Sequence, residues 1–101
     1  MIQVITSTYT VQNKNDAEQC ARSFISSLTA LVQSDHPQII LNDDNIDLRE
    51  SIIKFARYTI PIDNPKNKRF SITIIATVKY PYIIYRITSP DGDETTVIET
   101  I

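Results

Sequence analysis

The sequence predicts an α+β fold in two layers, with one amphipathic helix packed on a mainly antiparallel β-meander. Three observations lead to this prediction. Residues 16–34 place apolar side chains at three- and four-residue spacing, which forms one face of a helix. Residues 51–101 contain 21 β-branched residues, and several segments there alternate between apolar and polar positions. Turn-forming residues separate these segments, so we expect neighbouring strands to run antiparallel.

The first expected strand covers residues 2–11 (IQVITSTYTV), which are rich in β-branched residues and alternate in part. The helix over residues 16–34 follows. Asn15 is its expected N-cap, because Glu18 lies three residues further on, as in a capping box. Pro37 ends the helix, since the residue before a proline avoids α geometry.

The middle of the chain allows two interpretations. Residues 38–41 (QIIL) predict a short strand, and residues 42–47 (NDDNID) predict a polar loop. Residues 46–62 fit either a helix or a strand. The helix aligns Leu48, Ile52, Phe55 and Ala56, and the strand aligns Ile52, Ala56, Tyr58, Ile60 and Ile62. We favour a long strand from about Ser51, with Pro61 near its end.

The second half of the chain predicts a meander. Residues 70–80 (FSITIIATVKY) alternate most regularly, as a half-buried antiparallel strand does. Residues 82–89 and 94–101 flank the turn Pro90-Asp91-Gly92-Asp93, in which Gly92 can supply a positive φ, and they predict a hairpin. The expected element order is β-α-β-β-β-β-β, within a single domain over residues 1–101.

The composition excludes several classes of site. The single glycine, Gly92, cannot build the glycine-rich loops that bind phosphate. Cys20 and His36 are too few for a zinc site of thiolates and imidazoles, and they lie at opposite ends of the expected helix. The aspartates of residues 43–47 lack the glycine and the glutamate of an EF-hand loop. We therefore expect no catalytic residue, no metal, no cofactor and no enzymatic activity.

The beginning of the chain shows no pattern of a signal peptide. No apolar run approaches the roughly 18 residues that a membrane span needs. We therefore expect a cytoplasmic protein that does not contact a membrane.

The formal net charge of −2 hides an uneven layout. Residues 1–48 carry a net charge of −4, residues 49–86 a net charge of +6, and residues 87–101 a net charge of −4. Within the central block, five basic residues are the candidates for binding a partner. They are Lys66, Lys68, Arg69, Lys79 and Arg86. Aromatic residues interleave with the block, and basic side chains together with aromatic rings are how sheets bind single-stranded nucleic acid.

Two functions remain open at this point. We expect a non-enzymatic protein-binding module, of the type of small inhibitors, immunity proteins or phage and mobile-element accessory proteins. It would dock on another protein through a sheet edge or a sheet face. The alternative is a nucleic-acid-binding or toxin-like RNA-binding domain that uses the central basic block, and the acidic flanks count against it.

A homodimer is a further expectation. Residues 94–101 (ETTVIETI) offer a strand edge without lysine or proline, and such edges invite pairing with a second copy. The Ile-rich sheet face is the other expected contact. The alternative is that this last strand lies inside the sheet or is covered by residues 2–11.

Overall fold

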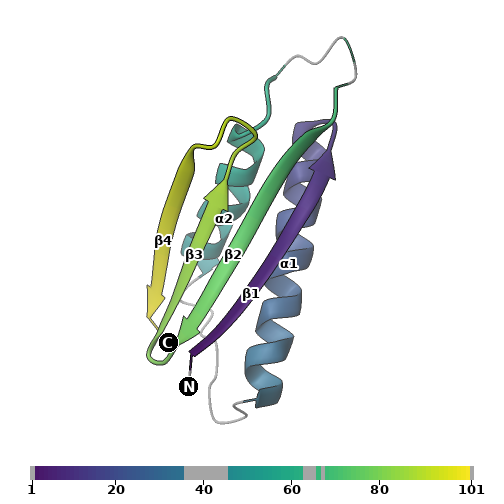
Figure 1. Ribbon diagram of the computed structural model, residues 1–101. Coiled ribbons are helices and arrows are strands. Elements are labelled where there is room, and N and C mark those ends of the chain that lie inside the picture. Colours follow the sequence, from purple (N-terminus) through teal and green to yellow (C-terminus); the bar gives the residue numbers. More distant parts are fainter. Residues whose placement is uncertain (1, 36–45, 63–65, 67, 101) are drawn as a thin grey trace.

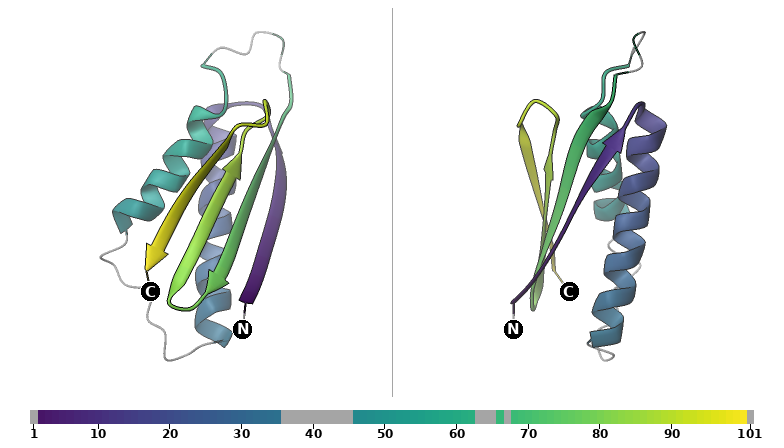
Figure 2. Two further views of the ribbon diagram at one scale, coloured as in Figure 1. Left: turned by 60° about the vertical axis from the view of Figure 1, so that its left-hand side comes forward. Right: turned by 45° about the vertical axis from the view of Figure 1, so that its right-hand side comes forward.

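The computed structural model describes residues 2–35, 46–62, 66 and 68–100. Its elements are β1 (Ile2–Val11), α1 (Lys14–Asp35), α2 (Ile46–Tyr58), β2 (Phe70–Lys79), β3 (Tyr82–Thr88) and β4 (Glu94–Thr100). The strands form one antiparallel sheet in the order β1-β2-β3-β4, and both helices lie on the same face of it (Figures 1 and 2). The predicted two-layer α+β class is confirmed. The predicted element order is wrong in detail, because the described residues contain two helices and four strands.

Each strand of the sheet pairs antiparallel with its neighbour in one register. β1 and β2 pair along their whole length, from Ile2 opposite Lys79 to Val11 opposite Phe70. β3 and β4 form the predicted hairpin, and Gly92 in its turn has a φ of 89°. This left-handed conformation is one that glycine adopts without steric cost. The turn is closed by the Gly92 amide, which donates to the Ser89 carbonyl at 3.0 Å.

The strands alternate between a buried inner face and an outer face, as a sheet covered on one side must. The inner positions of β2 and β3 are buried beneath the helices, including Ile74, Ala76 and Tyr85, except that Phe70 at the start of β2 is half-buried. The apolar faces of both helices close this core from the other side. The largest fully buried apolar residues are Leu28, Ile52, Ile60, Ile72, Ile74 and Ile83.

Helix α1 confirms the predicted amphipathic helix, with two corrections at its beginning. The helix begins at Lys14, and its N-cap is Asn13 rather than Asn15. The Asn13 side-chain carbonyl accepts a hydrogen bond from the Asp16 amide at 2.9 Å. In turn, the Asp16 carboxylate accepts a hydrogen bond from the Gln12 amide at 3.3 Å. Asp16, and not Glu18 as the sequence suggested, therefore supplies the carboxylate that accepts a hydrogen bond from a backbone amide just before the helix.

The long strand predicted from Ser51 is wrong, because residues 46–58 form α2. Ile52, Ala56 and Ile60 are all buried, and their spacing of four residues fits both a helix and a strand. The two interpretations differ at other positions. Ile53 is only 4% exposed, as a helix requires, whereas Tyr58 is 77% exposed and Ile62 is 94% exposed. The strand predicted over residues 38–41 lies outside the described residues, as does His36.

Candidate functional site

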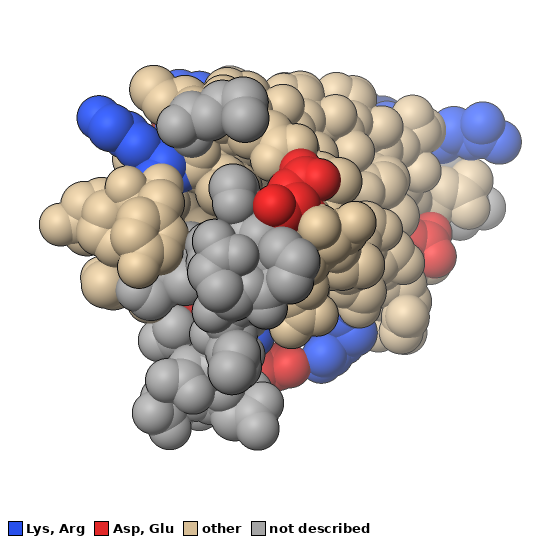
Figure 3. Space-filling model, turned by 90° about the horizontal axis from the view of Figure 1, so that it is seen from below, with Lys and Arg blue, Asp and Glu red and all other residues tan. Residues whose placement is uncertain are grey.

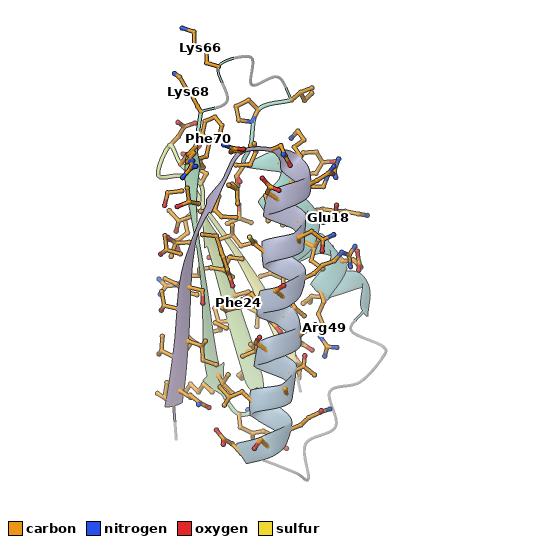
Figure 4. All side chains as sticks on the ribbon, turned by 90° about the vertical axis from the view of Figure 1, so that its right-hand side faces the viewer. Glu18, Phe24, Arg49, Lys66, Lys68 and Phe70 are labelled. Atoms are coloured by element: carbon orange, nitrogen blue, oxygen red, sulfur yellow. The ribbon has the colours of Figure 1, made fainter. Side chains whose placement is uncertain are left out.

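The five predicted partner-binding residues do not form one patch in the structure. Lys66, Lys68 and Arg69 are exposed at the end of the sheet where β2 begins, and Figure 4 shows Lys66 and Lys68 at that end. Lys79 closes β2 at its other end. At about 3.3 Å per residue, the ten residues from Arg69 to Lys79 separate these two positions by about 33 Å. Arg86 lies on β3, opposite Ile75 of β2.

The aromatic residues of the basic block are also divided between the surface and the core. Tyr85 is only 2% exposed on the inner face, and Phe70 is half-buried against the core. Neither ring is available for stacking on a base. Tyr58, Tyr80 and Tyr82 remain exposed, but Tyr58 lies at the end of α2 and the other two lie beside the β2–β3 turn.

The outer face of the sheet is not covered by any described element, as the side-on view of Figure 2 shows. Its side chains form rows that cross all four strands in the order β1, β2, β3, β4. One row is Val4, Thr77, Ile84 and Ile98. The row on one side of it is Ile2, Lys79, Tyr82 and Thr100, and the row on the other side is Thr6, Ile75, Arg86 and Thr96.

These rows bring together six apolar or aromatic side chains, which we call the outer patch: Ile2, Val4, Ile75, Tyr82, Ile84 and Ile98. Four of them are large side chains left substantially exposed, with Ile2 and Val4 at 59%, Ile98 at 55% and Tyr82 at 46%. Figure 3 views the lower end of the molecule, where a few charged side chains lie apart among uncharged residues, polar ones included. Thr77 and Lys79 of β2 lie between the β1 and β3 members of this group. Exposed apolar side chains gathered on one face with polar residues among them are typical of an interaction surface.

Two of the predicted basic residues lie in the same rows as the outer patch. Lys79 lies between Ile2 and Tyr82 in its row, and Arg86 lies next to Ile75. Arg86 is 3.8 Å from Glu94, and both side chains are more than 40% exposed, so this ion pair contributes little. Among the described residues of the outer face, the charged side chains are Lys79, Arg86 and Glu94, which leaves this face with a net positive charge.

A cluster of polar side chains lies on the opposite, inner face of the sheet, between β4 and α2. Glu99 is fully buried, and its carboxylate accepts hydrogen bonds from Arg49 Nη2 and from the Tyr85 hydroxyl, both at 2.6 Å. Burial raises the pKa of Tyr85 well above its usual range, and the adjacent Glu99 carboxylate raises it further. The cluster links β4 to the helix layer, and its closed geometry indicates a structural role.

The helix layer carries a groove of about 590 Å³ between α1 and α2, lined by Lys14, Glu18, Glu50, Lys54, Arg57, Tyr58 and Ile62. Its charges largely satisfy one another. Glu18 accepts hydrogen bonds from Arg22 and Arg57, which lower the pKa of its carboxyl group. Lys14 Nζ donates to the Arg57 carbonyl at 2.8 Å and lies 5.6 Å from the centre of the Tyr58 ring. These pairings indicate that the groove is held by contacts between the two helices.

Two expectations from the sequence concern the Cys20 thiol and metal ligands. Burial raises the pKa of the Cys20 thiol, and the nearby Asp16 raises it further, so this thiol is a weak nucleophile. Among the described side chains, no group of three His, Cys, Asp or Glu residues could hold a metal ion. No described helix has the length and apolar character of a membrane span.

Comparison with protein-family models, with curated proteins and with solved structures found no match to this chain. The candidate site therefore rests on the geometry of the outer face. Sequence reasoning had identified Lys79 and Arg86 but not the patch between them, because the patch depends on the register of four strands. The alternation of residues 70–80 was the one available signal, since it placed Ile75 among the polar positions.

Proposed function

We propose that this chain is a non-enzymatic protein-binding module that docks on another protein through the outer face of its sheet. The observation that carries the proposal is the outer patch, in which exposed aliphatic and tyrosine side chains lie across all four strands with Lys79 and Arg86 in the same rows. Tyrosine and arginine beside an apolar centre are the composition typical of a protein interface.

The net positive charge of the outer face indicates what kind of partner would bind there. A second copy stacked face to face would bring together two outer faces that each carry Lys79 and Arg86, with Glu94 as the one carboxylate among the described residues of each face. A partner with a flat apolar centre and acidic residues around it would instead be attracted to Lys79 and would bury the outer patch. The partner expected on this face is therefore a different protein with an acidic rim.

The test is affinity capture from native host cells, followed by titration of the purified partner. Ile98→Asp places a carboxylate in the outer patch at a position that is already 55% exposed, so the fold should tolerate it. Ile62→Asp is the matched control, because Ile62 is 94% exposed and lies after α2, away from the outer face. We expect Ile98→Asp to weaken binding at least tenfold and Ile62→Asp to leave it unchanged.

A second pair of variants tests the charge. Lys79→Glu reverses the charge beside the outer patch, and Lys66→Glu makes the same change at the far end of β2. We expect Lys79→Glu to slow association and Lys66→Glu to have no effect on the rate. Equal losses for both lysine variants, with nucleic acid as the captured ligand, would overturn the proposal in favour of binding through the dispersed basic residues.

A further inference from the structure

The free edge of β1 differs from every other exposed part of the sheet. β1 pairs with β2 on one side, and Figure 4 looks onto its other side, which no described element crosses. Its ten residues contain no charged residue, no proline and no glycine. Proteins usually protect a long edge strand with lysine, proline, a bulge or an inward-pointing charge. The unpaired amide and carbonyl groups of β1 are therefore open to another strand.

Helix α1 presents a matching surface beside this edge. At 100° per residue, the side of α1 that faces away from α2 carries a stripe of small or apolar residues. The stripe consists of Cys20, Ser23, Ser27, Leu31 and Ser34, and Asp16 lies at its N-terminal end. The helix has no charged residue between Arg22 and Asp35, and its ion pairs with α2 use the opposite side, through Glu18 and Arg22.

The apolar side chains along this edge are incompletely covered. Ile5 and Tyr9 on the inner face of β1 pack against the core but remain half-buried, as does Cys20 of α1. Another layer of protein at the edge would complete their burial. Small serine side chains on the helix would let a second helix approach closely.

We propose that a second copy of this chain occupies the edge, so that two β1 strands pair antiparallel about a two-fold axis and two α1 helices pack beside each other. The result is one continuous eight-stranded sheet with all four helices on one face. This dimer does not depend on the partner proposed for the outer face. It leaves both outer patches accessible on the same side of the enlarged sheet.

The lack of charge favours a second copy over another occupant. A two-fold contact pairs residue i of one copy with residue j of the other and j with i, so a charge within it needs an opposite charge on the same surface. The β1 edge carries no charge, and the α1 stripe has one charged residue, Asp16, at its N-terminal end. The contact would extend about 30 Å along the strand and about 20 Å through the sheet and helix layers. That is on the order of 600 Å² per copy, or about 1,200 Å² in total, at the lower limit for stable association.

The alternation of β1 restricts the register. Paired residues must share a face, so the numbers of each pair add to an even sum. A sum of 14 places Ser7 on the axis and pairs Ile5 with Tyr9 of the other copy on the inner face. An aromatic residue opposite a β-branched residue is a favourable cross-strand pair. A sum of 12 would instead place Ile5 opposite Ser7, which buries less apolar surface.

Sedimentation equilibrium over a range of concentrations tests the dimer. We expect the wild-type mass to rise from one copy to two in the micromolar range. In the proposed register Thr6 lies opposite Thr8 of the other copy, and both are exposed on the outer face. Thr6→Lys/Thr8→Lys should therefore raise the dimer dissociation constant at least 30-fold, whereas Thr6→Lys/Thr8→Glu should largely restore dimerisation by pairing opposite charges. Thr96→Glu is the control, because Thr96 occupies the same row at the β4 edge.

A wild-type protein that stays monomeric at all concentrations would overturn the proposal. A dimer that persists in Thr6→Lys/Thr8→Lys but dissociates in Thr96→Glu would also overturn it. Oxidation of single-cysteine variants, made with Cys20→Ser, tests the register. Ser7→Cys should form a disulfide-linked dimer, and linkage through Thr6→Cys instead would contradict the placement of Ser7 on the axis. Loss of the dimer together with retained partner capture would leave the proposed function unaffected.

Discussion

The two edges of this sheet are built in opposite ways. β1 offers ten uncharged residues along an open edge, with half-buried side chains beneath it. β4 is shorter, carries Glu94 at its beginning and buries Glu99 on its inner face. An inward-pointing charge is one of the devices that protect edge strands from pairing with other chains. We therefore expect a second copy to pair at β1 rather than at β4, which the sequence suggested as the dimer edge.

Glu99 can occupy its buried position only because two other elements supply partners. Arg49 comes from α2 and Tyr85 from β3, and each donates to one oxygen of the carboxylate. Among the described residues, Arg49 Nε is buried without a hydrogen-bond partner, which makes the arrangement costly as well as specific. The β4 edge therefore depends on a buried polar cluster. The β1 edge depends only on the alternation of inward and outward side chains along β1.

The largest expected effect comes from breaking this cluster. Arg49→Met removes the cation and leaves the Glu99 carboxylate buried without a counter-charge, so we expect the free energy of unfolding to fall by about 3–5 kcal/mol. Urea denaturation measures the loss. The double variant Arg49→Met/Glu99→Leu, which replaces both charges by apolar groups, should recover most of it. A loss below about 1 kcal/mol in the single variant would show that β4 is not held in this way.

A smaller effect is expected from Tyr85→Phe. This variant keeps the ring in the core and removes the hydroxyl that donates to Glu99 at 2.6 Å. A hydrogen bond to a charged group contributes about 1.5–3 kcal/mol, so urea denaturation should show a loss of about 2 kcal/mol. Tyr82→Phe is the matched control, since Tyr82 is exposed on the outer face and its change should be close to zero. Equal losses in the two variants would contradict the role given to Tyr85.

The smallest effect is a dependence on alkaline pH. The folded-state pKa of Tyr85 is raised above its unfolded value, which is about 10. The stability that this residue contributes is therefore fully present below pH 10 and is lost as the pH rises above 10, because the unfolded chain then ionises first. Urea denaturation between pH 9 and 11 should show the decline in the wild-type protein and a weaker decline in Tyr85→Phe. Identical slopes would contradict this assignment.

The secondary structure could be predicted from the sequence where the apolar residues fit only one period, either that of a strand or that of a helix. Residues 70–80 alternate cleanly and form β2, and Gly92 lies in a turn that needs a positive φ. The sequence was insufficient at residues 46–58, because Ile52, Ala56 and Ile60 fit both periods. The burial of Ile53 and the exposure of Tyr58 and Ile62 distinguish the helix from the strand. The burial of Ile53 depends on the neighbouring helix α1, and the sequence pattern of residues 46–58 alone cannot show that contact.

The candidate site was less predictable than the fold. In residues 94–101 an apolar residue falls on each face, Val97 on one and Ile98 on the other, so the direction of Glu99 could not be assigned. Its partner Arg49 is fifty residues away in sequence. Likewise, Val4, Ile84 and Ile98 come from three separate segments, and only the register of the sheet brings them into one row.

The central claim is that β1 is open to a second copy and β4 is not. Amide hydrogen exchange of the two strands, measured well below and well above the dimer dissociation constant, tests it most directly. We expect the outward amides of β1 to become protected at high protein concentration, while those of β4 exchange at the same rate at both concentrations. Protection that rises in β4 and not in β1 would contradict the account.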